Sequence, residues 1–216
     1  MNSYKKSKIY VSYAWGGQSE EIVELLESAF LHKGVEIIRD KNELSYKDSI
    51  RSYMKELGKG RCVVLIVNAK YLQSKNCMFE LLEIAKNGEL VDRIFPVVLS
   101  DAGIYDVQTR LGYVKHWESK MEELNAELKS VGSQANLHGF REELDLYTLI
   151  RAGCAQLLDI LVDMNALSPD EHRDSDFDSL ISSIEETLAN DFSGSQTQLT
   201  SIEEIESSLE TQMPNP

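Results

Sequence analysis

The stretch RCVVLIVNAKYLQSKNCMFELLEIAK, residues 61–86, decides the fold, because an apolar run, a polar loop and a helical pattern follow one another in it. Residues 62–67 are apolar without interruption and mostly β-branched, which predicts a strand buried on both faces of a parallel sheet. The polar residues 68–76 predict a loop. Four apolar side chains then recur at helical spacing and predict the buried stripe of a helix with Asn76 as its N-cap: Met78, Leu81, Leu82 and Ala85.

This helix carries two carboxylates, Glu80 and Glu83, on another face. With Asn76 as the N-cap, Glu80 lies within about one turn of the positive end of the helix, which favours the ionised carboxylate. One interpretation is that Glu80 only complements the helix dipole. The other is functional, because ligands of open α/β sheets bind outside the carboxyl ends of the strands. Glu83 would then raise the pKa of one of the two groups and make an acid/base pair. The spacing leaves both interpretations open.

Three further segments predict strands: residues 8–13, 35–38 and 93–99. Pro96 indicates that the last of them is an edge strand or has an irregular ladder. Four strands alternating with three helices predict right-handed crossovers and a parallel sheet with helices on both faces. We therefore predict an α/β fold, in which a fifth strand is not evident.

Two helices are predicted between the first three strands. Ser19 is the expected N-cap of the first, whose inward stripe comprises Ile22, Leu25, Leu26 and Ala29. Ser45 and Asp48 match the capping pattern at the start of the second, whose apolar face comprises Ile50, Tyr53, Met54 and Leu57.

The second half of the chain is predominantly helical. Apolar residues recur at helical spacing after Val107, with Trp117 as an expected core residue, and residues 140–164 predict one long helix. Residues 168–178, SPDEHRDSDFD, predict a linker or exposed connection. One more amphipathic helix is expected over residues 177–188. The last residues predict a flexible segment and a marginal helix.

Composition restricts the class of protein. The chain has 216 residues and is 42% hydrophobic, which is typical of a soluble globular protein, and no run is long enough to span a membrane. The N-terminus leads directly into a strand, so we expect no signal peptide. Three cysteines, an odd number, predict a reducing cytoplasmic location without a disulfide framework, and the four histidines show no metal-ligand spacing, so no metal is expected.

The net charge of −14 belongs to the second half of the chain. Residues 1–100 carry 15 Lys and Arg against 13 Asp and Glu, whereas residues 101–216 carry 7 against 23. A phosphate backbone would be repelled by that half, and no basic stripe stands out in the other. We therefore expect no nucleic-acid partner.

Four segments agree in order and spacing with a known family: KIYVSYAW, GVEIIRDKNEL leading into SYKDSI, CVVLIVNAKYLQSKNCMFEL, and RIFPVVLSDA. Together they resemble the Toll/interleukin-1 receptor (TIR) domain family in its bacterial form, over residues 6–100 closely and to residue 164 more loosely. The resemblance implies a flavodoxin-like three-layer fold with a helical C-terminal extension. It also implies a TIR domain over residues 1–164, followed by an acidic helical or flexible tail over residues 165–216.

The resemblance implies a reaction as well. In enzymatic members of the family, the Glu of an S-x-W-C-x-x-E-L box cleaves the nicotinamide–ribose bond of NAD+. The matching residue here is Glu80, and Glu83 falls outside the box. An anionic carboxylate stabilises the oxocarbenium-like state of glycosidic cleavage. Nicotinamide is already a cationic leaving group, so a second carboxyl group is not obligatory. NAD+ is then the substrate, and no cofactor is implied.

The other implied substrate-binding residues come from three segments: Tyr13, Ala14, Trp15 and Gly16 after the first strand, Asp40, Tyr46 and Lys47 in a mobile loop, and Ser74 and Cys77 in the box. Trp15 either stacks on a flat ring or is a surface aromatic. Lys47 either meets a diphosphate or is solvated. Cys77 is expected to pack rather than to act as a nucleophile, since no His partner is suggested. Asn76 replaces the Trp of the box, and the Gly common in the mobile loop is replaced near Lys47.

Three functions follow as hypotheses. The first is an NAD+ hydrolase, with or without ADP-ribosyl cyclase activity, which is activated by self-association and serves antiviral defence or NAD depletion. The second is a non-catalytic adaptor that docks other TIR or sensor proteins. The third, a phosphorelay receiver, is disfavoured because the third strand ends at Asn68, where an acceptor Asp would be required.

Overall fold

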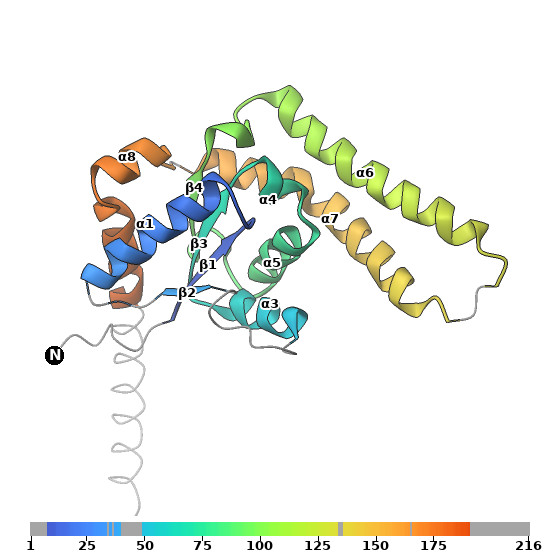
Figure 1. Ribbon diagram of the computed structural model, residues 1–216, viewed down its shortest axis with the longest axis horizontal. Coiled ribbons are helices and arrows are strands. Elements are labelled where there is room, and N and C mark those ends of the chain that lie inside the picture. The colour runs from blue at the N-terminus through green and yellow to red at the C-terminus, as the bar shows by residue number, and fades with distance from the viewer. Residues whose placement is uncertain are drawn as a thin grey trace, which may run out of the picture.

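The computed structural model describes residues 8–33, 35, 37–39, 49–133, 136–164 and 166–190. Within them, four strands form one parallel sheet in the order β2-β1-β3-β4. The strands are β1 (Ile9–Tyr13), β2 (Ile37–Arg39), β3 (Cys62–Val67) and β4 (Ile94–Val98). The predicted α/β fold with a central parallel sheet is confirmed, and helices cover both faces in a flavodoxin-like three-layer arrangement (Figure 1).

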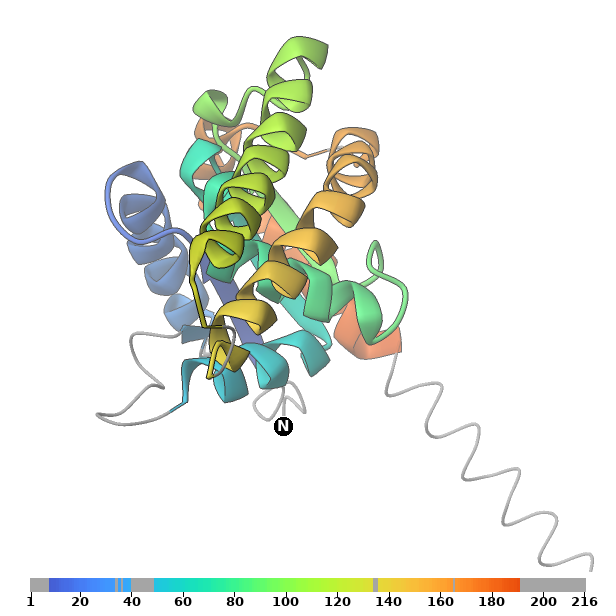
Figure 2. The same ribbon diagram turned by 90° about the vertical axis from the view of Figure 1, so that its right-hand side faces the viewer.

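The helices divide between the two faces of the sheet. One face is covered by α3 (Ile50–Lys59), α4 (Ala69–Gln73), α5 (Lys75–Lys86), α6 (Val107–Ser130) and α7 (His138–Asp163). The other is covered by α1 (Gln18–His32) and by a helical segment of residues 178–190. The short helices η2 (Ser100–Ala102) and α8 (Pro169–Asp174) connect the layers. Figures 1 and 2 show α6 and α7 as an antiparallel pair that extends beyond the sheet.

The continuous apolar run forms the centre of the sheet, as predicted. All six residues of β3 are fully buried. Val63, Leu65 and Val67 pack into the core beneath α5 and α7, and the alternate residues pack into the core beneath α1. None of the described helices is long and apolar enough to cross a membrane.

β4 is an edge strand, and Pro96 lies in its middle. Val63 N donates to Arg93 O at 2.8 Å, and Leu99 N donates to a β3 carbonyl at the same distance. The odd-numbered backbone groups of β4 therefore face β3, while Pro96 faces away. Its missing N–H removes no bond from the ladder, which confirms the expected edge position.

Several predicted helix starts were wrong. Gly17 is the N-cap of α1, and Ser19 is buried inside the helix. Ser74, not Asn76, is the N-cap of α5. The expected loop 68–76 contains α4, because the Asn68 side chain caps an additional short helix. The buried stripe of α5 consists of Cys77, Met78, Glu80, Leu81 and Ile84, so it is shifted from the predicted one.

The inward stripe of α1 and the start of α3 were also predicted. Leu25, expected in the inward stripe of α1, is 46% exposed, and Val23 and Phe30 are buried instead. Ser45 and Asp48 lie outside the described residues, and the helix that follows begins at Ile50 with Ser49 as its N-cap.

Residues 168–178 were predicted to be a linker or an exposed connection, and most of them are exposed. They contain α8, which begins with a capping box between Ser168 and Glu171. The helix that follows packs on the sheet through Phe177, Leu180, Ile181, Ile184 and Leu188. The division into a domain of residues 1–164 and a tail of residues 165–216 stays a prediction, although residues 177–188 share a core with β1 and β3.

Candidate active site

Glu80 is a buried carboxylate in the second turn of α5, and only 7% of it is exposed. Ser12 Oγ, in β1, donates a hydrogen bond to Glu80 Oε2. The same Oγ lies 3.0 Å from the Tyr71 hydroxyl. Because Ser12 gives its single hydroxyl hydrogen to Glu80, Tyr71 is the donor in the second bond. The three side chains thus form a directed chain from Tyr71 through Ser12 to the carboxylate.

The ionisation of Tyr71 supports this direction. Burial raises the pKa of Tyr71 well above its usual range, and the electrostatic interactions with Cys77 and Glu80 act in the same sense. The hydrogen bond with Ser12 opposes them only in part. Tyr71 therefore keeps its proton at neutral pH and remains a donor.

The end of β3 places Tyr71 at this point. The Asn68 side chain accepts a hydrogen bond from Tyr71 N at 2.7 Å and so starts α4 directly after the strand. The Asn68 amide also donates to Ser19 Oγ of α1 at 2.9 Å. Ser19, which was expected to cap α1, instead fixes the residue that orients Tyr71.

Glu80 lies in a pocket of about 280 Å³ at the carboxyl end of β1. Six of the residues singled out from the sequence line it together: Tyr13, Ala14, Trp15, Ser74, Cys77 and Glu80. The remaining wall comes from α3, from α4 and from the start of α5: Ile50, Tyr53, Met54, Lys70 and Asn76. A buried carboxylate therefore lies among mainly apolar and aromatic side chains, in the region where open α/β sheets bind ligands.

The loop after β1 forms one side of the pocket. Trp15 is 51% exposed there, and its carbonyl accepts a hydrogen bond from Lys70 Nζ at 2.6 Å. Gly16 is not among the lining residues, and its N–H donates to Glu20 Oε2 at 3.2 Å. A phosphate at the Gly16 N–H would thus meet the Glu20 carboxylate, which disfavours phosphate binding at this point.

The remaining predicted residues are elsewhere. Asp40, Tyr46 and Lys47 lie outside the described residues, so their placement stays a prediction. Glu83 does not share the pocket of Glu80. It lines a different hollow with Arg51 and Lys55, and its carboxylate lies 2.6 Å from Lys86 Nζ. The acid/base pair suggested by the spacing of Glu80 and Glu83 is therefore not formed.

Sequence reasoning missed two residues that orient Glu80, Ser12 and Tyr71, and four residues of the pocket wall: Ile50, Tyr53, Met54 and Lys70. One signal was present for Ser12, since a hydroxyl within an otherwise apolar buried strand needs a hydrogen-bond partner. Tyr71 and Lys70 gave no comparable signal, because the segment that contains them was expected to be a loop.

Comparisons with known proteins identify the family and the fold. A family model described as "TIR domain" matches residues 9–129, more than half of the chain. No curated protein matches the chain. Among solved structures, the chain is similar to the TIR domains of the activated Roq1 resistosome directly recognizing the pathogen effector XopQ. That similarity has a TM-score of 0.52 at 20% sequence identity, and it covers 85% of this chain and 99% of that chain. At such low identity the structural likeness concerns the fold alone.

Proposed function

The chain belongs to the TIR domain family, and from this premise we propose that it is an NAD+ glycohydrolase with Glu80 as its catalytic residue. The observation that carries the proposal is the buried Glu80 carboxylate. It is oriented by Ser12 and lines a pocket at the carboxyl end of β1.

The reaction breaks the bond between ribose C1′ and the nicotinamide ring nitrogen. The bonding electron pair leaves with nicotinamide, which becomes neutral, and positive charge develops on the ribose. The Glu80 carboxylate stabilises that charge. Water then adds to C1′ and loses a proton, which gives ADP-ribose. If an adenine nitrogen adds in place of water, the product is a cyclic ADP-ribose.

The pocket suits one end of the dinucleotide. Its volume of about 280 Å³ is close to the lower limit, roughly 300 Å³, of ordinary small-molecule sites, so it accepts nicotinamide and its ribose better than all of NAD+. Trp15 offers an aromatic face. Lys70 is the cation among the described lining residues, and it would meet the diphosphate. NAD+ is the substrate in this proposal, and no cofactor is invoked.

Self-association is part of the proposal, because the similar Roq1 TIR domains come from an assembled resistosome. We also propose a cytoplasmic location, which the three buried cysteine thiols support, since all three lie in the described residues and none forms a disulfide. The biological role that we propose is NAD+ depletion in antiviral defence, with other TIR or sensor proteins as partners.

The test is release of nicotinamide from NAD+ at high protein concentration or with a crowding agent. Glu80→Gln removes the charge but keeps the shape, so we expect turnover to fall at least about a thousandfold if the carboxylate stabilises the transition state. Glu83→Gln is the matched control from the same helix and should keep wild-type turnover. If the wild type releases no nicotinamide under any assembly condition, the non-catalytic adaptor is the better interpretation.

A further inference from the structure

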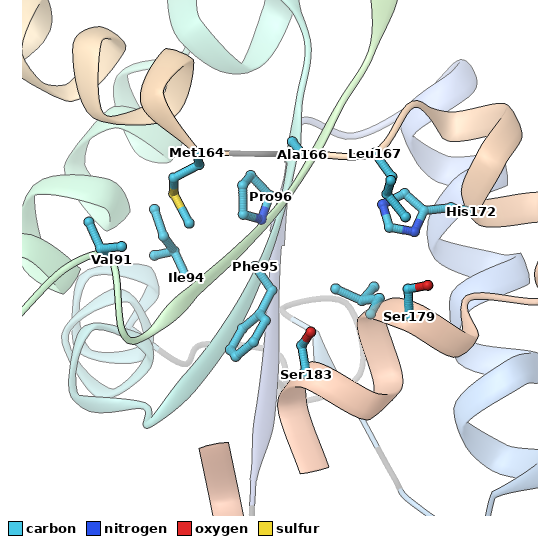
Figure 3. A pocket seen from close by; sticks show the side chains of 11 residues that line it. Val91, Ile94, Phe95, Pro96, Met164, Ala166, Leu167, His172, Ser179 and Ser183 are labelled. Carbon is cyan, nitrogen blue, oxygen red and sulfur yellow. The ribbon is translucent and has the colours of Figure 1, made fainter. Parts of the chain in front are cut away.

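A second hollow lies between the edge strand β4 and the C-terminal helical layer (Figure 3). It has a volume of about 540 Å³, well within the range of roughly 300–1,000 Å³ that small-molecule sites occupy. Phe95 and Pro96 of β4 form one wall, and Ser179 and Ser183 of the helical segment 178–190 lie on the other. None of its lining residues belongs to the pocket of Glu80.

The hollow exists because no strand in the described part of the chain pairs with the outer edge of β4. Pro96 has no N–H to offer a further strand and faces outward, and no further strand is found among the described residues. Residues 166–190 cross this edge as a connection and helices instead of a strand, which leaves the space between them and β4.

His172 gives the hollow its chemical character. It is 3% exposed, and within the described part of the chain neither of its ring nitrogens has a hydrogen-bond partner. Its ring stacks on Phe177 with 5.7 Å between ring centroids, and in Figure 3 it points from α8 towards the hollow. Burial lowers the pKa of His172, so the imidazole is neutral at pH 7 and presents one donor and one acceptor. Buried polar groups normally have partners, so this unpaired ring calls for a ligand that supplies one.

The polarity and charge of the lining residues indicate which class of ligand fits the hollow. The polar groups, His172, Ser179 and Ser183, all come from the C-terminal layer, where Leu167 and Leu180 also line the hollow. The remaining lining residues are apolar: Val91, Ile94, Phe95, Pro96, Met164 and Ala166. The C-terminal layer is acidic, with seven carboxylates and one arginine over residues 166–190, so an anion is disfavoured. We propose that this hollow binds a neutral aliphatic alcohol, whose hydroxyl group pairs with His172 and whose chain lies along β4.

Binding needs a small side-chain movement. Both imidazole nitrogens are shielded from contact with water, and the partly buried Leu167 lines the same hollow as His172. Rotamer changes of this kind are common on ligand binding. When a hydroxyl group displaces Leu167, at least one of the two unpaired ring nitrogens of His172 gains a hydrogen bond.

The test uses 1-octanol as the probe and octanoate as its charged counterpart, with the full chain. The methyl group of Met164 lines the hollow and is followed by ¹³C NMR after assignment with Met164→Leu. We expect a saturable shift of this signal with 1-octanol and a change in the His172 ring ¹⁵N signals. Octanoate should bind at least about tenfold more weakly, because its carboxylate is repelled by the acidic C-terminal layer.

Variants separate this site from nonspecific partitioning of the probe. His172→Leu should weaken 1-octanol binding about tenfold, the value of one buried hydrogen bond. Ser183→Leu fills the hollow from an exposed helix position and should abolish the Met164 shift, whereas Ser182→Leu, exposed and outside the hollow, should leave it unchanged. A Met164 shift that never saturates, survives Ser183→Leu, or is as strong with octanoate would overturn the proposal.

Discussion

Ser12 Oγ of β1 donates a hydrogen bond to Glu80 Oε2 of α5, and 68 residues of sequence separate the two. The carboxylate is therefore oriented by the central sheet rather than by a surface loop. Strands beneath a buried core move less than loops do, so the direction of the carboxylate is set before any ligand arrives. The proposed chemistry depends on this pre-orientation.

The first prediction concerns Ser12→Ala. Without the hydroxyl group the Glu80 side chain is free to turn, and a displacement of 1 Å costs up to about a hundredfold in rate. We expect kcat for nicotinamide release to fall by roughly that factor while KM changes less than about threefold. Urea unfolding should also show a loss of about 1–3 kcal/mol, because Tyr71 and Glu80 lose a buried partner. An unchanged kcat would show that Ser12 does not position the carboxylate.

The second prediction concerns Tyr71→Phe, which removes the donor to Ser12 and keeps the ring. Tyr71 acts on Glu80 only through Ser12 in the directed chain, so kcat should fall less than in Ser12→Ala, by about fivefold. The double variant should be no slower than Ser12→Ala alone, since the shared path is already broken. Effects that multiply in the double variant would mean that Tyr71 acts by a separate route.

The third prediction concerns Lys70→Met, which tests whether this lysine meets the diphosphate. We expect KM for NAD+ to rise about tenfold, the value of one charge-assisted contact. Nicotinamide riboside has no diphosphate and is the matched substrate, so its KM should change little. Equal increases for both substrates would indicate instead that the loss of the bond to the Trp15 carbonyl disturbs the loop.

The fold was predictable because its strongest signals are local. The apolar run of β3 is buried on both faces, and such a run has few alternatives in a chain where strands and helices alternate. The positions of Tyr13, Trp15 and Cys77 follow from the same rule, since loops at the carboxyl ends of parallel strands meet at one edge.

The contacts that complete the site are not local. Ser12, Tyr71 and Glu80 meet only after the sheet forms, and no periodicity in the sequence encodes their hydrogen bonds. The caps were misplaced for a related reason, because Asn, Ser and Gly all suit the position and tertiary contacts choose among them. The acidic stretch 168–178 is an exposed connection, as predicted, but its short helix α8 and the burial of Phe177 were not foreseen, because so few apolar residues give no periodicity.

The fourth prediction concerns alkaline pH and Cys154. Burial raises the pKa of this thiol from 9.0 to about 11, so at pH values between these two the folded chain holds a proton that the unfolded chain has released. Its contribution to stability is complete below pH 9 and is lost as pH rises towards 11. In Cys154→Ala the unfolding free energy should therefore decrease less steeply with rising pH, and the slope should differ from wild type by up to about 1.4 kcal/mol per pH unit.

Urea unfolding at pH 8 and at pH 10.5 measures this difference. Cys154→Ala also removes packed atoms, but that loss is the same at both pH values and cancels in the comparison. Some decline should remain in the variant, because Tyr147 has its pKa raised to about 12. Identical slopes in wild type and variant would exclude Cys154 as a source of the pH dependence.

The fifth prediction concerns Arg93, which is 6% exposed and donates to the carbonyl oxygens of Gly58, Gly60 and Ile84. These carbonyls lie at the ends of α3 and α5, where helices leave acceptors unpaired. Arg93→Met would leave the buried Gly58 and Gly60 carbonyls without this donor, whereas the Ile84 carbonyl keeps the Asn87 N–H. We therefore expect the unfolding free energy to fall by at least about 2 kcal/mol.

Two further variants make this result specific to the guanidinium group. Arg93→Lys should recover only part of the loss, because an ammonium group cannot reproduce the planar set of donors. Arg61→Met, in the residue just before β3, is the control and should cost less than Arg93→Met, since its hydrogen bond to the Asp92 carbonyl is exposed and 3.4 Å long. Because α5 carries Glu80, the Arg93 variants should also lower nicotinamide release in proportion to the unfolded fraction and not beyond it. A larger loss of activity in fully folded Arg93→Lys would mean that Arg93 also determines the position of α5 in the active site.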